Sequence, residues 1–293
     1  MSSELQSINT CQDGNGEDVT DARGLTIFNK PSVQSPYLSV YVDSDEYNMK
    51  HSKRGKCLIF NNKDFEMHTR LNERKGTERD AEQLYHCFRA LDFDVVLYRN
   101  LTVKEMRNEL EKVSREDHSD RDCFVCCILS HGENGLVYGR DGKFPNDMIF
   151  SPFTGNVCST LAGKPKIFFI QACQGDKLDK GVVVAQGRDI ADAASQFFKI
   201  PSHADFLICY STVPGFYSWR NTSNGSWFIQ ALCNVLKSHA KNTDLQSLMT
   251  IVNRKVAYEF ESCVPTDPGM DKMKQVPCIT SMLTRKIYFR PKV

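Results

Sequence analysis

The chain of 293 residues is long enough to bury one large core or two modest ones, and 41% hydrophobic with 25% charged residues is ordinary for a globular protein. Its 37 Lys and Arg residues balance 36 Asp and Glu residues, so charge gives no support for binding to nucleic acid or to a membrane surface. No apolar run approaches the ~18 residues of a spanning helix, and residues 1–21 lack the features of a signal peptide. These features predict an intracellular, cytoplasmic protein.

Twelve cysteines are scattered along the chain, and several lie inside apolar runs, which is typical of reduced, buried thiols. Cys123 and Cys126 have the spacing of a metal-binding pair, but they fall in a predicted strand, where residues three apart face opposite sides. No second pair accompanies them. We therefore expect no metal and no other cofactor.

Residues 1 to about 50 are polar and are predicted to form a mobile leader. Strands and helices then alternate, and Thr102 with Glu105 forms a capping box, while Thr77 followed by Asp80 marks another helix start. A turn over 140–143 predicts a hairpin. The alternation favours an α/β fold with a mainly parallel sheet and helices on both faces. The expected strands are 56–61, 95–98, 123–129, 167–170, 206–210 and 287–289, and the later helices are 227–236 and 245–260.

The strand over 167–170 leads into Cys173, which places a thiol at the carboxyl edge of the sheet, where such folds bind ligands. A thiol needs a base or a positive neighbour to become a strong nucleophile. Among the seven histidines, His131 differs because it directly follows a buried strand and should occupy the same edge. Taken singly, each residue is equally compatible with a structural role, as a strand-end histidine or a buried core cysteine.

The pentapeptide 171–175, Gln-Ala-Cys-Gln-Gly, matches the caspase signature, and His131 lies upstream at about the expected spacing. Over roughly residues 45–290 the chain resembles an executioner caspase, a cysteine protease that cleaves after Asp during programmed cell death. The resemblance implies the caspase-like three-layer fold, with a mainly parallel six-stranded sheet and helices on both faces. Its other matching blocks are 130–133, 164–166, 204–207, 210–215, 218–220, 225–228 and 274–278.

The resemblance implies the catalytic roles. Cys173 would attack the scissile carbonyl and form a thioester, and His131 would protonate the leaving amine and then activate water. The backbone NH groups of Gly132 and Cys173 would hold the oxyanion. No carboxylate that would orient His131 is evident in the sequence.

The resemblance also implies the substrate-binding residues. Arg74, Gln171 and Arg220 match the S1 pocket, where two guanidinium groups and an amide suit the carboxylate of Asp. A narrow S4 pocket is expected to favour Asp over a bulky aromatic at P4. The other matching positions are Tyr217, Trp219 and Met270 for S2, and Asn221, Trp219 and Trp227 for S4, while Cys263 and Met270 stand where many executioner caspases carry aromatic residues.

Two Asp-x-x-Asp sequences predict activation by cleavage. Asp192 precedes Ala193, and Asp21 precedes Ala22; Asp189 and Asp43 are alternative sites for the linker and the propeptide. Without the resemblance, an Asp-rich stretch would indicate only a soluble linker. The resulting parts would be a propeptide (1–21), a large subunit (22–192) and a small subunit (193–293), with 176–199 as the cleavable linker.

The expected partners are protein substrates with Asp at P1, an upstream initiator caspase, and a second copy of the large and small subunits, paired through a last strand near 286–289. The new Ala22 and Ala193 termini are similar to tetrapeptides that inhibitory BIR domains bind. The main alternative is a catalytically idle homologue that regulates an active caspase by dimerisation. A related protease that cuts after basic residues would need a carboxylate where Arg220 stands.

Overall fold

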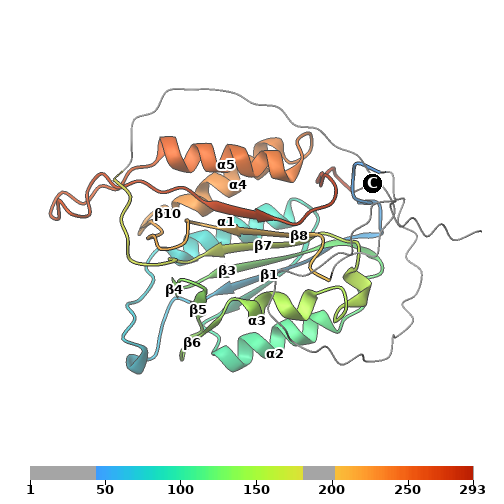
Figure 1. Cartoon of the computed structure of the whole chain (residues 1–293), viewed down its shortest axis with the longest axis horizontal. Helices are drawn as coiled ribbons and strands as arrows, with labels where there is room; N and C mark the ends of the chain where they lie inside the picture. Colours follow the sequence, from blue (N-terminus) through green and yellow to red (C-terminus); the bar gives the residue numbers. More distant parts are fainter. Residues whose placement is uncertain (1–43, 181–201, 293) are drawn as a thin grey trace, which may run out of the picture. The chain divides into compact units, whose positions relative to one another are not determined.

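The computed structural model describes residues 44–180 and 202–292 and contains a central six-stranded sheet (Figure 1). Five neighbouring strands run parallel, and the strand at one edge, β11, is antiparallel to β8. The sheet has the order β11-β8-β7-β3-β1-β2, with the bounds β1 (Lys53–Asn61), β2 (Asp94–Arg99), β3 (Arg121–Leu129), β7 (Lys166–Gln171), β8 (Phe206–Tyr210) and β11 (Cys278–Ser281).

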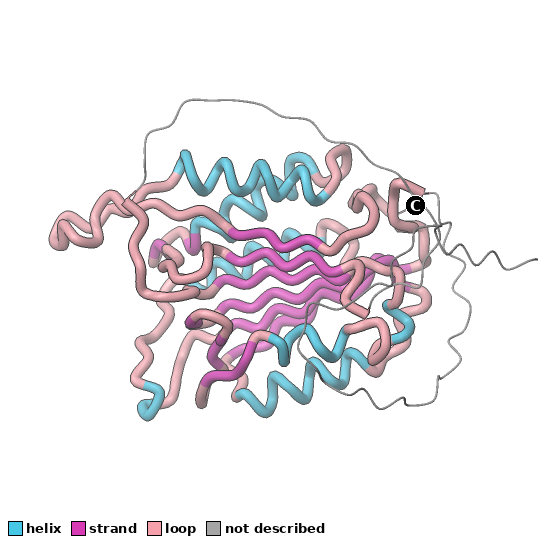
Figure 2. The backbone as a smooth tube through the Cα atoms, viewed as in Figure 1, coloured by secondary structure: helices cyan, strands magenta, loops and turns pink. Residues whose placement is uncertain are grey.

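Helices cover both faces of the sheet, as the alternation of elements predicts (Figure 2). One core lies between the sheet and the helices α1 (Thr77–Arg89), α4 (Trp227–His239) and α5 (Leu245–Glu259). The other lies beneath α2 (Val103–Ser114) and α3 (Asp147–Phe150). The three-layer fold is therefore confirmed.

Short elements extend the loops at the sheet's edge. A three-stranded sheet contains β4 (Gly132–Glu133), β5 (Leu136–Tyr138) and β6 (Lys143–Pro145), and the turn between β5 and β6 is the predicted hairpin. A second small sheet pairs β9 (Arg220–Asn221) with β10 (Gly225–Ser226). Short 3-10 helices span Met67–Thr69, Ser151–Phe153 and Ser159–Leu161.

Local sequence signals account for several of these elements. Thr102 caps α2: its hydroxyl accepts from the Glu105 amide, and the Glu105 carboxylate accepts from the Thr102 amide, which is the predicted capping box. Cys123 and Cys126 of β3 lie in different cores, on opposite faces of the sheet, as a period of two requires. Those two thiols therefore cannot hold one metal ion.

One predicted strand is wrong. Residues 287–289 form no strand, because Ile287 and Phe289 are buried as part of an irregular segment that packs into the core. The edge strand is β11, which the sequence analysis did not identify. The predicted helix start at Thr77 is confirmed, because α1 begins at this residue. Gly76 holds the N-cap position with a φ of +86°, and the Thr77 hydroxyl donates to the Asn61 side chain, 2.7 Å away.

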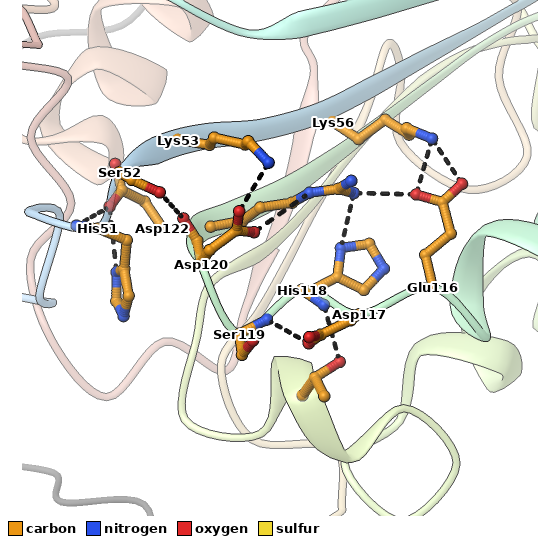
Figure 3. A network of polar contacts seen from close by, with 12 residues as sticks. His51, Ser52, Lys53, Lys56, Glu116, Asp117, His118, Ser119, Asp120 and Asp122 are labelled. Atoms are coloured by element: carbon orange, nitrogen blue, oxygen red, sulfur yellow. Dashed lines mark hydrogen bonds and ion pairs between the residues drawn. The ribbon is translucent and has the colours of Figure 1, made fainter.

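A network of charged side chains ties together the amino ends of β1 and β3, at the end of the sheet where these strands begin (Figure 3). Lys56 of β1 forms an ion pair with Glu116 at 2.5 Å, and His51 hydrogen-bonds the buried Asp122 of β3. The candidate catalytic residues lie after the carboxyl ends of β3 and β7, so this network fixes the sheet away from them.

Candidate active site

The parallel pairing of β3 with β7 brings the predicted catalytic residues together. Leu129 lies opposite Gln171, so the chain leaves both strands at the same edge of the sheet. Gly132 then lies against Cys173, because a Cβ added at Gly132 would be 2.7 Å from the Cys173 carbonyl oxygen. A side chain at Gly132 would force the two segments apart, which explains why this position needs glycine.

A backbone carbonyl orients the His131 ring. The Nε2 atom of His131 lies 2.8 Å from the carbonyl oxygen of Asn72, and the Phe65 ring packs on the imidazole with its centroid 4.9 Å away. Because a carbonyl can only accept, Nε2 holds the proton and Nδ1 is free to accept one. Sequence analysis could not find this contact, since every residue carries a carbonyl group.

Burial lowers the pKa of His131 to about 4, because the imidazolium form loses solvation, and the nearby charges of Arg74 and Arg220 lower it further. The hydrogen bond to the Asn72 carbonyl opposes this shift. In the unliganded protein at neutral pH, the imidazole is therefore uncharged and can act as a base.

The segment around Ser218 contacts both residues that flank Ala172. The Cys173 Sγ atom lies 3.5 Å from the Ser218 amide nitrogen and 3.9 Å from its carbonyl oxygen. The Gln171 Nε2 atom donates to the Ser218 hydroxyl at 2.7 Å. Gln171 and Cys173 thus face the same side, as expected for residues two apart in an extended chain. Sequence analysis gave Ser218 no individual role.

Arg74 presents unpaired donors from a buried position. Its side chain is 1% exposed, and Nη1 donates to the Asn62 carbonyl oxygen at 3.1 Å and to the Thr77 hydroxyl at 2.7 Å. Within residues 44–180 and 202–292, Nε and Nη2 have no hydrogen-bond partner, and neither has the Gln171 Oε1 atom. Burial lowers the pKa of Arg74 to about 9, because the cation lacks solvation.

Asp80 is a buried carboxyl group beside both predicted S1 arginines. It accepts hydrogen bonds from the amide and hydroxyl of Ser226, at 2.7 and 2.6 Å, which fixes α1 to the start of α4. Arg220 donates from Nε to the Lys75 carbonyl oxygen at 2.8 Å. Burial raises the pKa of Asp80 and lowers that of Arg220, while the charge of Arg74 draws the pKa of Asp80 down. Sequence analysis predicted Asp80 only as a helix-start residue.

Aromatic rings form a stack beside this cation pair. The Trp227 ring lies between the rings of Trp219 and Phe260, with centroid distances of 5.8 and 5.6 Å. Trp227 is buried, whereas Tyr217 is 38% exposed. The rings form one rigid apolar surface, in which Phe260 is a member that sequence analysis assigned only to a helix end.

The remaining predicted specificity residues lie in two turns. The Asn221 side-chain oxygen accepts from the amides of Ser223 and Asn224 at 2.9 Å each, so this oxygen shapes its own turn. The Met270 carbonyl accepts from the Ser262 hydroxyl, and Cys263 is exposed.

The segment that follows Cys173 runs along the loop that carries Tyr217. The Gly215 amide donates to the Gln174 carbonyl at 2.7 Å, and the Tyr217 amide donates to the Lys177 carbonyl at 2.9 Å. The predicted linker therefore begins in contact with a predicted substrate-binding loop. Residues 181–201 and the predicted cleavage residues Asp21, Asp43, Asp189 and Asp192 lie outside the described residues.

Among the described residues, no group of three or more His, Cys, Asp or Glu side chains is arranged to hold a metal ion. In the same part of the chain, no helix has the length and apolar character needed to cross a membrane.

Comparison with known proteins finds matches to caspases by sequence family, by similar relatives and by solved structure. The caspase domain family matches residues 54–288. The chain is 51% identical to caspase drICE of Drosophila melanogaster over 84% of this chain and 73% of that protein, and 48% identical to caspase-3 of Bos taurus over 84% and 88%. The crystal structure of caspase-1 from Spodoptera frugiperda superposes with a TM-score of 0.82 at 44% identity, over 88% of this chain and 98% of that chain.

Proposed function

Because the chain belongs to the caspase family, we propose that Cys173 and His131 are the catalytic pair with which it cleaves proteins after aspartate. The protein is a cysteine-type endopeptidase, and its similarity to drICE, caspase-7 of Gallus gallus and caspase-3 makes it an apoptotic executioner. An idle homologue is not favoured, since the nucleophile, the base and both S1 arginines are present.

His131 removes the proton from the Cys173 thiol, and the thiolate attacks the scissile carbonyl carbon to form a tetrahedral intermediate. The amides of Gly132 and Cys173 donate to the oxyanion. The imidazolium then gives its proton to the leaving amine, and the neutral ring activates water to hydrolyse the thioester. The contact between His131 Nε2 and Asn72 supports this assignment, because it leaves Nδ1 free to exchange the proton.

The observation that carries the substrate assignment is the pair of unpaired donors on buried Arg74. A P1 carboxylate accepting from Nε and Nη2 would form the bidentate pair that a guanidinium favours, and Gln171 and Arg220 complete the pocket. A site built this way rejects an isostere that lacks the charge, because its buried donors remain unpaired.

Peptide reporters that differ only at P1 test this proposal. The kcat/KM for Asp should exceed that for Asn by roughly 10⁴-fold, the discrimination typical of sites built to bind a polar group. Comparable hydrolysis after Asn or Lys would contradict the S1 assignment. At P4, the Trp219–Trp227–Phe260 stack supports a narrow subsite that prefers Asp, so a reporter with Trp at P4 should react more slowly.

We infer that the chain is a zymogen, cut after Asp21 and Asp192 into subunits 22–192 and 193–293 by an upstream initiator caspase. Support comes from the contacts between residues 174–177 and the Tyr217 loop, which connect the start of the linker to a substrate-binding segment. Asp192→Ala should block processing by the initiator, and Asp189→Ala is the matched control. Normal two-chain maturation of Asp192→Ala would move the site to Asp189.

We propose a homodimer of large and small subunit pairs, joined through β11 rather than through 286–289 as the sequence analysis expects. β11 is the outer strand of the sheet, and Thr280 and Ser281 on it are exposed. An unpaired edge can add a strand from a second copy. Thr280→Arg should shift sedimentation toward the monomer. If Lys286→Asp dissociates the dimer and Thr280→Arg does not, the interface lies at residues 286–289 instead.

A cytoplasmic location and capture of the Ala22 and Ala193 termini by a BIR-domain inhibitor complete the proposal. The cysteines of the described residues are all free, which fits a reducing compartment. Cell fractionation tests the location. Pull-down with a BIR domain, using Ala22→Gly and Ala193→Gly as controls, tests the inhibitor.

A further inference from the structure

Two cysteines meet where α1 packs against α4, outside the catalytic site. Cys87 lies on α1 and Cys233 on α4, and the two thiols are close enough to shift each other's pKa. The Cys87 Sγ atom also lies 4.0 Å from the Cys233 carbonyl oxygen. Both thiols are free and only partly buried, so they lie at the margin of the core.

The surroundings make the two thiols chemically unequal. The interaction with the Cys233 thiol lowers the pKa of Cys87, burial opposes the shift, and the Lys237 ammonium lowers the pKa further. The same interaction and burial raise the pKa of Cys233, and the charge of Asp80 raises it further. Cys87 is therefore the more acidic of the two thiols.

The other thiols of this core differ from the pair. Cys57 and Cys127 lie beneath it and are fully buried, and burial raises the pKa of both. Reactivity toward oxidants requires both thiolate character and access. Of the described cysteines around the α1–α4 contact, only the Cys87–Cys233 pair combines partial exposure, a member with a lowered pKa and a neighbouring thiol.

We propose that Cys87 and Cys233 form a redox modification site, at which a hydroperoxide such as hydrogen peroxide produces a reversible disulfide between α1 and α4. The Cys87 thiolate attacks the peroxide, the O–O bond breaks, and a sulfenic acid and hydroxide form. The Cys233 sulfur then attacks the Cys87 sulfur, the S–OH bond breaks, and the Cys233 proton leaves with the oxygen as water. The two thiols together lose two electrons and two protons, and peroxide is reduced to two waters.

The disulfide has a consequence that rests on the proposed cleavage. Cys87 falls in residues 22–192 and Cys233 in residues 193–293, so the bond would hold the large and small subunits together covalently after the linker is cut. It would join the helix that follows Arg74 to the helix that begins at Trp227, and both helices position substrate-binding residues.

The test uses the uncut full chain with Cys173→Ala, so that neither oxidation of Cys173 nor proteolysis affects the result. The protein is treated with hydrogen peroxide, alkylated and digested with trypsin without reduction. Peptides 80–89 and 221–237 should appear linked, with a mass two hydrogens below their sum, and dithiothreitol should separate them. Cys87→Ser and Cys233→Ser should each abolish the linked pair, whereas Cys278→Ser, which removes another partly buried thiol, should leave it intact.

Sulfinic acid on Cys87 with no link to Cys233, or a disulfide from Cys87 to a different cysteine in the native sequence, would overturn the proposal. Circular dichroism of each variant excludes unfolding as the cause of a lost link. In a second arm, the active enzyme is cut, oxidised and run on a non-reducing gel, where the two subunits should migrate as one band. Dithiothreitol should split this band into the two subunits. A band that stays single after dithiothreitol, together with the linked peptides above, would place the failure in the cleavage proposal and leave the disulfide intact, whereas separate bands without reduction would contradict the disulfide in the cut enzyme.

Discussion

Replacing Arg74 with Met separates the function of this cation from its effect on stability. The substitution removes two buried donors, Nε and Nη2, which have no hydrogen-bond partner among the described residues. A hydrogen bond to a charged group contributes about 1.5–3 kcal/mol, so two absent bonds cost about 3–6 kcal/mol of transition-state binding. That corresponds to roughly a 10²- to 10⁴-fold loss of kcat/KM.

Stability should respond differently, because the buried guanidinium carries a desolvation cost that lowers its pKa to about 9. Removing the charge also removes this cost, which offsets the loss of the two Nη1 hydrogen bonds to Asn62 and Thr77, so we expect the melting temperature to change little. The assay is hydrolysis of an Asp-Glu-Val-Asp reporter with a parallel thermal melt. Arg89→Met, at an exposed position at the end of the helix that follows Arg74, is the control. A folded Arg74→Met variant within tenfold of the native kcat/KM would refute the reasoning.

Three further substitutions test the site and its supports. Between about pH 6.5 and 4 the unfolded chain binds more protons at His131 than the folded chain does, so the free energy of unfolding is highest above pH 6.5 and falls on acidification. Denaturation at pH 7 and at pH 5 should therefore show a smaller loss of this free energy in His131→Gln than in the native protein. A Cβ at Gly225, where φ is +92°, would overlap Asp80, so Gly225→Ala should cost about 1–3 kcal/mol in urea unfolding, whereas Gly142→Ala, with nothing within 4 Å, should cost little. Thr102→Ala should cost about 1 kcal/mol in the same assay by removing the α2 cap, and an unchanged midpoint would contradict the capping assignment.

The sequence predicts the sheet wherever a strand is fully buried, because a continuous apolar run has few alternative structures. β3 and β7 are of this kind. It fails at β11, whose Cys-Ile-Thr-Ser sequence is half-exposed and has no clear alternation of apolar residues. Ile287 and Phe289 are apolar residues two apart, which is the pattern of a strand, but they are buried as part of an irregular segment. The apolar pattern therefore predicts that this segment is buried, but it does not show which segment pairs with the edge strand β8.

The candidate site also contains residues that the sequence predicts and contacts that it does not. Cys173 and His131 follow from their positions after two parallel strands, whereas the contacts of the Asn72 carbonyl and of the Ser218 backbone depend on tertiary structure alone. Asp80 illustrates an intermediate case. Its place in the first turn of α1 could be predicted, but its pairing with Ser226, 146 positions later, joins segments that no local pattern connects.

The central claim, that Cys173 is the nucleophile of an Asp-specific site, is tested most directly by labelling with an aspartyl fluoromethyl ketone. The cleaved native protein should gain one covalent adduct by intact mass, located on Cys173 after digestion, and should lose all activity toward the Asp-Glu-Val-Asp reporter. Cys173→Ala should neither be labelled nor hydrolyse the reporter. An adduct on another cysteine, or hydrolysis that survives in Cys173→Ala, would contradict the account.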